Sequence, residues 1–301
     1  MNRYNIHPAW LGRTLNISVV GAGGTGSIML GVLAQMAVAL QALGHPGVDV
    51  SVIDDDVVSA ANIGRQAFFP PDIGQPKASV LVNRINQSFG LNFTAHVERL
   101  VNDPELRLIR ELKNDTDIWI GCVDSRKARK AIHGLYTSQL ERWSSAPVAW
   151  IDCGNSTRTG QVVLGLHEGP RESPNTWGNA GHPMQRHRRE VVLPCVADLF
   201  AEAVDESADS LDDAPSCSLA EALRKQDLFT NRMVCDTAVN LLWQLLRHGQ
   251  ISSHGAFINL ETMRINPMAI NPAAWKRLGF ELAQPGQPEV QDQTQEEEAA
   301  A

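Results

Sequence analysis

The sequence predicts an α/β fold, a Rossmann-like doubly wound sheet with an additional C-terminal strand-and-helix region. A β-branched run at residues 17–20 has the composition of a buried strand, and a glycine-rich turn follows it directly. The glycines of this turn are Gly21, Gly23, Gly24 and Gly26. An apolar, alanine-rich helix is predicted at 28–43, and a second β-branched strand at 48–53 ends in three aspartates. Strand, glycine turn and helix are the start of a nucleotide-binding β-α-β unit.

Hydrophobic periodicity and turn residues predict the remaining elements. Further strands are expected at 93–100, 117–123, 148–152, 159–167 and, as a pair, within 256–265. Helices are expected at 78–89, from Asp103, after Ser125 and over most of 218–248. Asp103 is the predicted N-cap of its helix because Pro104 follows at the first helical position.

Composition limits the class of protein. The chain has 301 residues and 43% hydrophobic residues, which is enough for a sizeable core. Its net charge of −8 argues against nucleic acid as the main partner, because no basic surplus exists to neutralise phosphates. No run approaches the length of a membrane span and the N-terminus lacks a signal-peptide pattern, so we expect a cytoplasmic protein without a membrane partner. Five cysteines without a C-x-x-C pair suit a reducing compartment.

Changes in composition divide the chain into four segments. Residues 1–167 form the predicted nucleotide-binding half, and 168–190 form a long surface loop rich in proline, glycine, arginine and histidine. Residues 191–283 form the C-terminal half of the same domain, and the Gln/Glu-rich tail at 284–301 is expected to be disordered. The histidines in and near the loop lack paired ligand spacing, so solvated side chains are favoured over a metal site.

The glycine turn predicts a phosphate site. Glycines let the backbone turn tightly and approach a phosphate, whose charge meets the N–H groups of the helix N-terminus. The same pattern also occurs in turns that bind no nucleotide, and a β-α-β turn can hold NAD, FAD, ATP or S-adenosylmethionine. An acid at the end of the second strand, such as Asp54, lies where a nucleotide ribose is held.

Four motifs in order resemble the ThiF/MoeB/HesA family, which has the adenylating fold of ubiquitin-activating enzymes. They are Gly21-Ala-Gly-Gly-Thr-Gly-Ser, Ile53-Asp-Asp-Asp-Val-Val-Ser-Ala-Ala-Asn-Ile-Gly-Arg-Gln, Asp72-Ile-Gly-Gln-Pro-Lys-Ala and Gly121-Cys-Val-Asp-Ser-Arg-Lys-Ala-Arg. The four motifs span residues 17–129, and a weaker match covers 215–246. The long loop and the Pro-Ser-Cys-Ser-Leu-Ala-Glu stretch are similar to ThiF-type proteins of bacterial PRTRC gene clusters.

The resemblance implies a reaction. In this family, the C-terminal glycine carboxylate of a ubiquitin-like β-grasp protein attacks the α-phosphate of ATP, and pyrophosphate leaves. Nucleophile and phosphates are both anionic, so catalysis must offset charge repulsion. By resemblance, Arg65 and Lys77 are phosphate-binding cations, Asp124 is associated with magnesium and Asp54 holds the ribose. The other implied nucleotide-binding residues are Gly21, Gly23, Gly24, Asp56, Asn62 and Gln66.

Each of these residues also has a structural interpretation. Arg65 could be a solvated loop cation, Lys77 could begin a surface helix, and Asp124 could cap the helix that follows, with Arg129 on its outer face. The ordered set of motifs, rather than any one residue, favours function.

The resemblance also implies an acyl-accepting cysteine before the last long helix. Cys217 fits this position, since it precedes a predicted helix start that would favour the thiolate. Cys195, which follows the long loop, is the alternative, and the protein could also act without a catalytic cysteine. Cys122, Cys153 and Cys235 are expected to be packing residues.

Two features depart from the family pattern. The paired C-x-x-C motifs of the structural zinc site are missing, so no zinc is expected. The N-terminal Arg-Gln element, whose arginine reaches the partner subunit's nucleotide site, is also missing, and Arg3 and Arg13 are candidate replacements. A homodimer, a β-grasp substrate protein and a subsequent conjugating enzyme remain the family expectation, with ATP and Mg²⁺ as cofactors.

Three other functions compete with adenylation of a ubiquitin-like protein. The first two strands alone would allow a nicotinamide-dependent oxidoreductase, but such an enzyme has no need of Arg65 and Lys77 converging on a triphosphate. A non-enzymatic scaffold would not need these cations or Asp124. The third alternative is activation of a small-molecule or peptide carboxylate by the same chemistry.

Overall fold

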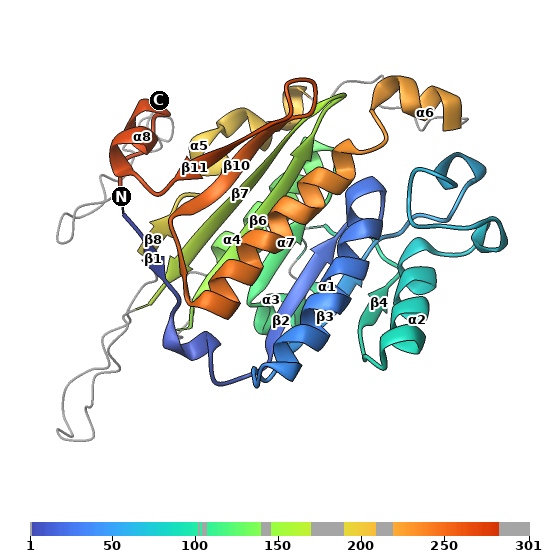
Figure 1. The fold of residues 1–301 in the computed structure, drawn as a ribbon, viewed down its shortest axis with the longest axis horizontal. Coiled ribbons are helices and arrows are strands. Elements are labelled where there is room, and N and C mark those ends of the chain that lie inside the picture. The colour runs from blue at the N-terminus through green and yellow to red at the C-terminus, as the bar shows by residue number, and fades with distance from the viewer. Residues whose placement is uncertain are drawn as a thin grey trace, which may run out of the picture.

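A mixed sheet runs through the centre of the molecule, and its strands β4, β3, β2, β5 and β6 are parallel (Figure 1). Their bounds are β2 Leu15–Val20, β3 Val48–Ile53, β4 Thr94–His96, β5 Ile118–Gly121 and β6 Val148–Asn155. The computed structural model describes residues 2–101, 103, 107–139, 146–169, 190–208 and 219–282. Ile17 on β2 lies opposite Val50 on one side and Ile118 on the other. All three side chains are buried, because parallel strands are covered by helices on both faces.

The sheet continues beyond β6 with antiparallel strands. Strand β7 (Thr159–Glu168) pairs with β6, and β10 (Ser253–Asn259) and β11 (Arg264–Ala269) extend the sheet from β7. Strand β8 (Glu190–Leu193) pairs with the other end of β7. The predicted fold class is confirmed: a Rossmann-like sheet carries an additional region of C-terminal strands and helices.

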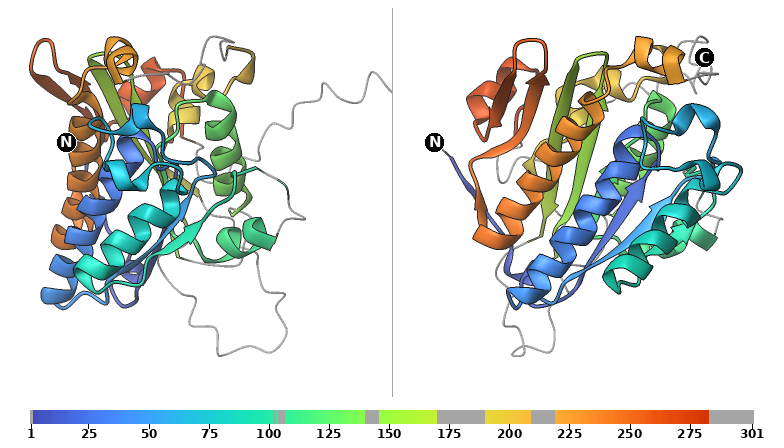
Figure 2. Two further views of the ribbon diagram at one scale, coloured as in Figure 1. Left: turned by 90° about the vertical axis from the view of Figure 1, so that its right-hand side faces the viewer. Right: turned by 45° about the vertical axis from the view of Figure 1, so that its right-hand side comes forward.

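Helices cover both faces of the sheet (Figure 2). On one face lie α1 (Gly24–Ala42), α2 (Lys77–Phe89) and α7 (Thr230–His248), with α7 packed between α1 and the β6–β7 pair. On the other face lie α3 (Arg107–Asp115) and α4 (Arg126–Ser138). Trp119 on β5 and Trp150 on β6 are fully buried within this core.

Helix α1 is long and apolar enough to cross a membrane by length and composition, and it is the one such helix in the described part of the chain. The expectation that no run reaches this length was therefore wrong. In the most apolar 18-residue stretch of α1, 56% of the stretch is buried inside the protein. The helix packs against α7 and α2. A central core helix has the same composition, because it is apolar on nearly all sides.

Short elements complete the chain. The remaining helices are η1 Pro8–Trp10, η2 Ala60–Asn62, η3 Pro70–Asp72, α5 Val196–Leu199, η4 Ala201–Ala203, η5 Glu206–Ala208, α6 Leu219–Lys225 and α8 Pro272–Arg277. The N-terminal strand β1 (Tyr4–Asn5) pairs with β9 (Gln250–Ile251), directly after α7. Tyr4 also donates its hydroxyl proton to Glu168 Oε2 at 3.0 Å, so the lead-in is fastened to the body of the protein.

Several predicted elements differ in extent. The strand predicted at 93–100 is limited to Thr94–His96, and the helical stretch 218–248 consists of two helices, α6 and α7. The described part of α3 begins at Arg107, and the proposed first turn at 104–106 lies outside the described residues. Residues 170–189, which make up most of the predicted surface loop, and the whole predicted tail at 284–301 also lie outside them.

Candidate functional site

The glycine turn lies at the carboxyl end of β2, where the strand order reverses between β3 and β5. Gly21 has φ +93°, and a Cβ there would lie 2.7 Å from the carbonyl oxygen of Cys122. A Cβ on Gly26 would lie 1.8 Å from the Gly21 carbonyl oxygen. These two glycines are therefore required by the packing of the turn itself.

The middle glycines of the turn differ from one another. A Cβ on Gly24 would lie 2.3 Å from Nδ2 of Asn231, at the start of α7. A Cβ on Gly23 would meet nothing within 4 Å. The protein's own packing gives no reason for a glycine at position 23, whereas a ligand approaching the backbone at the N-terminus of α1 would need this space.

Asp54 follows β3 and supports the glycine turn. Its Oδ2 accepts the Ala22 backbone N–H at 2.6 Å, and its Oδ1 accepts the Asp56 backbone N–H at 2.9 Å. Burial raises the pKa of the Asp54 carboxyl above its usual value, while the Ala22 N–H and the charge of Lys77 act in the opposite direction. The side chain lines a cavity beside the turn, where a ribose would contact it.

Lys77 begins α2 and extends toward the same region. Its Nζ lies 2.7 Å from Asp56 Oδ2, and its backbone N–H donates to the Asp56 carbonyl oxygen at 2.9 Å. The Lys77 side chain is only 8% exposed, whereas the Asp56 side chain is 61% exposed. The ammonium group is thus fixed beside Asp54 and Asp56, and the solvent side of this pair remains accessible.

Arg65 and Gln66 follow η2 and present polar groups without partners. Arg65 Nε and Gln66 Oε1 are buried and form no hydrogen bond within the described part of the chain. Burial lowers the pKa of Arg65, and the opposing charge is that of Asp124, so this carboxylate lies near the guanidinium. Asn62 is committed locally, since its Oδ1 accepts the Ser59 backbone N–H at 2.8 Å. A half-buried cation whose buried Nε–H is unpaired is suited to an anionic ligand.

Asp124 lies in the exposed turn between β5 and α4, where Ser125 caps α4. Arg129 holds this turn by donating to the carbonyl oxygens of Val123 at 3.1 Å and Asp124 at 3.4 Å. The Nε of Arg129 donates to Asp152 Oδ1 at 3.0 Å. Arg129 is therefore not on the outer face of α4, as its structural interpretation supposed, but beneath the turn that presents Asp124.

Asp152 is fully buried at the end of the parallel sheet. Burial raises the pKa of its carboxyl, whereas Arg129 and, less strongly, Gln161 lower it. Its Oδ2 has no hydrogen bond of normal geometry within the described chain, although the Gln161 side chain lies close to it. Sequence reasoning missed the role of this pair. The only signal was an aspartate ending a β-branched strand, with an arginine five residues after Asp124.

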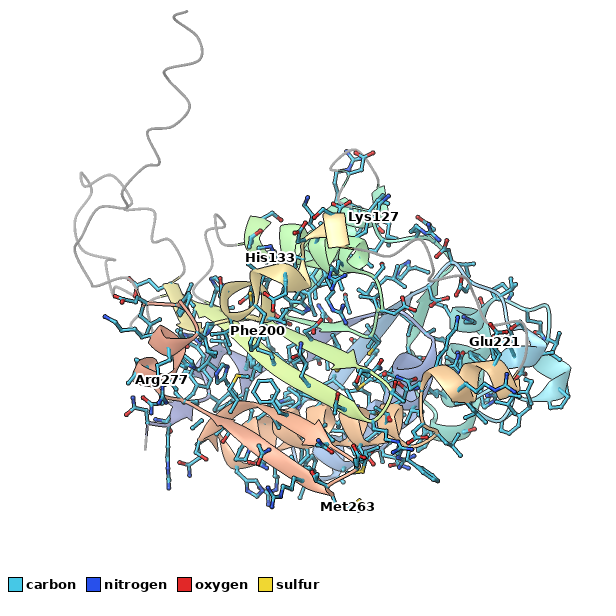
Figure 3. All side chains as sticks on the ribbon, turned by 90° about the horizontal axis from the view of Figure 1, so that it is seen from above. Lys127, His133, Phe200, Glu221, Met263 and Arg277 are labelled. Atoms are coloured by element: carbon cyan, nitrogen blue, oxygen red, sulfur yellow. The ribbon has the colours of Figure 1, made fainter. Side chains whose placement is uncertain are left out.

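Two cavities open at the carboxyl edge of the sheet, and they share one of the described residues, Asp124. The first, of about 470 Å³, extends from Gly21 and Asp54 to Lys127 on α4. The second, of about 890 Å³, runs from Arg129 past the β6–β7 turn to Phe200 and Phe257. Figure 3 looks down on this edge and labels Lys127 and Phe200. Each cavity has the volume of a small-ligand site.

The other predicted participants lie elsewhere or outside the described residues. Cys195 is 1% exposed and packs closely on Gly165. A Cβ added to Gly165 would lie 2.3 Å from the Cβ of Cys195. Burial raises the pKa of the Cys195 thiol well above its usual value, which makes this sulfur a poor nucleophile here. Cys217 lies outside the described residues. Cys153 and Cys235 are buried, as expected for packing residues, and Cys122 is partly buried.

Both candidate arginines for action on a partner subunit are engaged within this chain. Arg13 forms a two-pronged ion pair with Asp117 at the amino ends of β2 and β5, away from the glycine turn. Arg3 donates to Gln250 Oε1 at 3.0 Å. Neither contact places an arginine near a nucleotide site.

The carboxylates that line the two cavities do not form a complete set of metal ligands among the described residues. Within the described ranges, no three histidine, cysteine, aspartate or glutamate side chains converge as a metal site. Asp124 could therefore supply one ligand, and a magnesium ion would take its remaining ligands from phosphates and water, as Mg²⁺ commonly does.

Comparison with known proteins gives one family match and several structural neighbours. The ThiF family model matches residues 12–276. A solved structure of PaaA is 15% identical, with a TM-score of 0.54, and the match covers 85% of this chain and 73% of PaaA. E. coli MccB, solved with ATP, is 13% identical, with a TM-score of 0.52, over 85% of this chain and 64% of MccB. At these identities the two structures establish a common fold. No curated protein matches the chain.

Proposed function

The chain belongs to the ThiF family, and from this premise we propose that it is an ATP-dependent adenylyltransferase that activates a carboxylate. One observation carries the proposal: a cavity beside the glycine turn and a second groove meet at Asp124. A nucleotide in the first cavity and a carboxylate in the second could therefore react at their junction. A hydride-transfer enzyme would need no cations around this junction.

The residues around the junction have complementary roles in this reaction. Gly23 leaves room for the nucleotide to approach the backbone, and Asp54 accepts hydrogen bonds from the ribose. A substrate carboxylate oxygen attacks the α-phosphorus, the bond to the bridging oxygen breaks, and pyrophosphate leaves. Arg65 and Lys77 stabilise the negative charge that moves toward the leaving group.

Arg129 keeps Asp124 in place through the carbonyls of its turn. Asp124 would hold Mg²⁺, which when bound neutralises phosphate charge. Gln66 offers an unpaired buried oxygen and Asn62 a carboxamide on the same loop. Asp56 orients Lys77 through their ion pair.

For the substrate, we propose the C-terminal carboxylate of a ubiquitin-like β-grasp protein. The second groove supports a polypeptide, because it leads from Asp124 across the ends of β6, β7 and β10 to the partly exposed ring of Phe257. An extended tail could lie in this groove while the folded body of the partner rests outside it. A small-molecule or free peptide carboxylate is the alternative. A homodimer, a subsequent conjugating enzyme and a cytoplasmic location complete the proposal.

Cys217 is the proposed acyl acceptor. Leu219 follows it by two residues in the chain and begins α6, which packs against η2. A Cβ on Gly64, the neighbour of Arg65, would lie 3.4 Å from Cδ2 of Leu219. Leu219 therefore lies beside the loop that carries Arg65.

Pyrophosphate exchange with candidate β-grasp proteins tests the proposal. MgATP should raise the melting temperature, NAD should not, and the correct partner should stimulate exchange. Asp124→Ala and Arg65→Ala should each lower exchange by about a hundredfold or more, because each removes a preorganised charge. Arg158→Ala, which breaks an exposed ion pair with Asp227, serves as the matched control. Stabilisation by NAD but not by ATP would refute the proposal.

A further inference from the structure

A buried set of amide and hydroxyl groups joins the glycine turn to the second groove. Asn155, the last residue of β6, donates from Nδ2 to Thr25 Oγ1 at 3.0 Å and to Asn231 Oδ1 at 2.8 Å. Thr25, in the first turn of α1, donates its hydroxyl proton to Asn231 Oδ1 at 3.0 Å. Thr25 and Asn231 are 3% and 2% exposed, so these hydrogen bonds are shielded from water.

The orientation of these side-chain amides follows from the backbone carbonyl of Ser156, which can only accept a hydrogen bond. The backbone carbonyl of Ser156 receives Gln226 Nε2–H at 3.4 Å, so Gln226 turns its Oε1 toward Asn231. Asn231 Nδ2 donates to that Oε1 at 2.8 Å, which turns Asn231 Oδ1 toward Thr25 and Asn155. Asn155 must then present its NH₂ group inward.

The consequence appears at the groove. Asn155 is exposed and lines the second cavity, while both of its amide protons are used inside the protein. Its Oδ1 forms no hydrogen bond within the described part of the chain, so it is the side-chain polar atom left to accept one from a ligand. The groove therefore carries a hydrogen-bond acceptor whose orientation is fixed by the groups behind it.

We propose that Asn155 is a specificity-determining residue, whose Oδ1 accepts a hydrogen bond from a substrate N–H group next to the carboxylate. This inference rests on the proposed function, since it concerns the carboxylate site of that reaction. A backbone amide N–H beside the terminal carboxylate is such a donor. A carboxylate on an N-alkylated residue, or on a hydrocarbon chain, has no donor and would leave the acceptor desolvated and unpaired.

Asn231 has a positioning role in this arrangement. Without Asn231 Oδ1, the Asn155 amide loses one of its two inward acceptors and can rotate. An NH₂ group facing the groove would no longer select an N–H donor. Removing Asn231 should therefore change substrate discrimination, although Asn231 does not itself line the groove.

Two small probes test the inference on the full-length protein. N-acetylglycylglycine carries an N–H beside its carboxylate, and N-acetylglycylsarcosine has the same chain with that nitrogen methylated. Their dissociation constants are measured by NMR titration without ATP, and MgATP binding is measured separately by calorimetry. The wild type should bind the first probe about five- to tenfold more tightly, as expected for one hydrogen bond.

Three variants separate recognition from general packing. Asn155→Ala should bind both probes about equally, and Asn231→Ala should reduce the ratio to about twofold or less. Asn266→Ala removes another asparagine that lines the same cavity and should leave the ratio unchanged. Because Asn155 is exposed, its variant should fold even if Asn231→Ala does not.

Clear results would overturn the inference. These are equal binding of both probes by the wild type, binding of neither probe, or a ratio that persists in Asn155→Ala. If MgATP binds and the probes do not differ, the inference fails while the proposed function stands. If MgATP does not bind, the proposed function fails, whereas the probe ratio still reports on Asn155.

Discussion

Arg129 joins the buried Asp152 carboxylate, at 3.0 Å, to the turn that presents Asp124. Arg129 and Asp152 are 23 positions apart in the sequence, and the parallel pairing of β5 with β6 brings them together. The Arg129 side chain is 13% exposed and that of Asp152 is 1% exposed. The turn that presents Asp124 is thus held through a buried ion pair between α4 and β6.

Loss of Arg129 should destabilise the protein strongly. Arg129→Ala leaves the Asp152 charge buried without its cation, and removing one partner of a buried pair typically costs about 3–5 kcal/mol. Urea unfolding measures this change in the free energy of unfolding. Arg158→Ala breaks the exposed pair with Asp227 and should cost about 1 kcal/mol or less. If Arg129→Ala and Arg158→Ala had equal free energies of unfolding, the buried pair would contribute no more to stability than the exposed pair.

The glycines of the turn should separate folding from binding. Gly26→Ala places a Cβ 1.8 Å from the Gly21 carbonyl oxygen, and such overpacking should cost about 2 kcal/mol or more. Gly23→Ala meets no atom within 4 Å and should change the free energy of unfolding by less than about 1 kcal/mol. The same variant should weaken MgATP binding at least about tenfold, because the methyl group blocks the phosphate approach.

Thermal unfolding and calorimetric titration with MgATP give both quantities for each variant. A Gly23→Ala protein that binds MgATP as well as the wild type would place the phosphates elsewhere. A stable Gly26→Ala protein would contradict the packing described for the turn.

The parallel half of the sheet could be predicted from sequence because its strands are continuous β-branched runs between turn residues. The runs 17–20 and 48–53 correspond to β2 and β3, and the family resemblance carried by the motifs around them is confirmed. The predicted strand pair within 256–265 overlaps the end of β10, the turn after it and the start of β11. Each of these signals is local, so the sequence alone reveals it.

The features that sequence reasoning missed depend on distant contacts. Strand β1 has two residues and pairs with β9, so it has no periodicity of its own. Thr25 and Asn231 are 206 positions apart, and only the packing of α7 against α1 brings them together. In the sequence, Arg129 cannot be told from a surface arginine of a basic helix. Its burial follows from its ion pair with Asp152.

Acid should destabilise the protein through His254. Its Nδ1–H donates to the Leu164 carbonyl at 3.1 Å, and its Nε2 accepts the Trp275 indole N–H at 2.9 Å. Burial lowers the pKa of His254 from 6.5 to about 4. The unfolded chain therefore gains a proton as pH falls below 6.5, while the native protein does not until about pH 4.

The contribution of His254 to the free energy of unfolding should be about 3 kcal/mol. It is fully present above pH 6.5 and lost as the pH falls to about 4. Burial also lowers the pKa of His96 and His133, so their contributions have the same sign. The free energy of unfolding of the wild type and of His254→Gln is therefore measured by urea titration between pH 7.5 and 4. A wild-type slope no steeper than that of the variant would show that His254 does not titrate in this way.

The last prediction concerns the acyl acceptor. Cys195 is buried, with a thiol pKa well above its usual value, and it packs on Gly165, so it should not accept an acyl group. Cys195→Ala should lower the melting temperature but retain a thiol-sensitive conjugate with the correct β-grasp partner on a non-reducing gel. Cys217→Ala should retain pyrophosphate exchange and lose that conjugate, because adenylation precedes transfer to sulfur. If the conjugate survives in Cys217→Ala and disappears in Cys195→Ala, the segment around α5 must open during turnover. If the wild type forms none, the reaction stops at the adenylate.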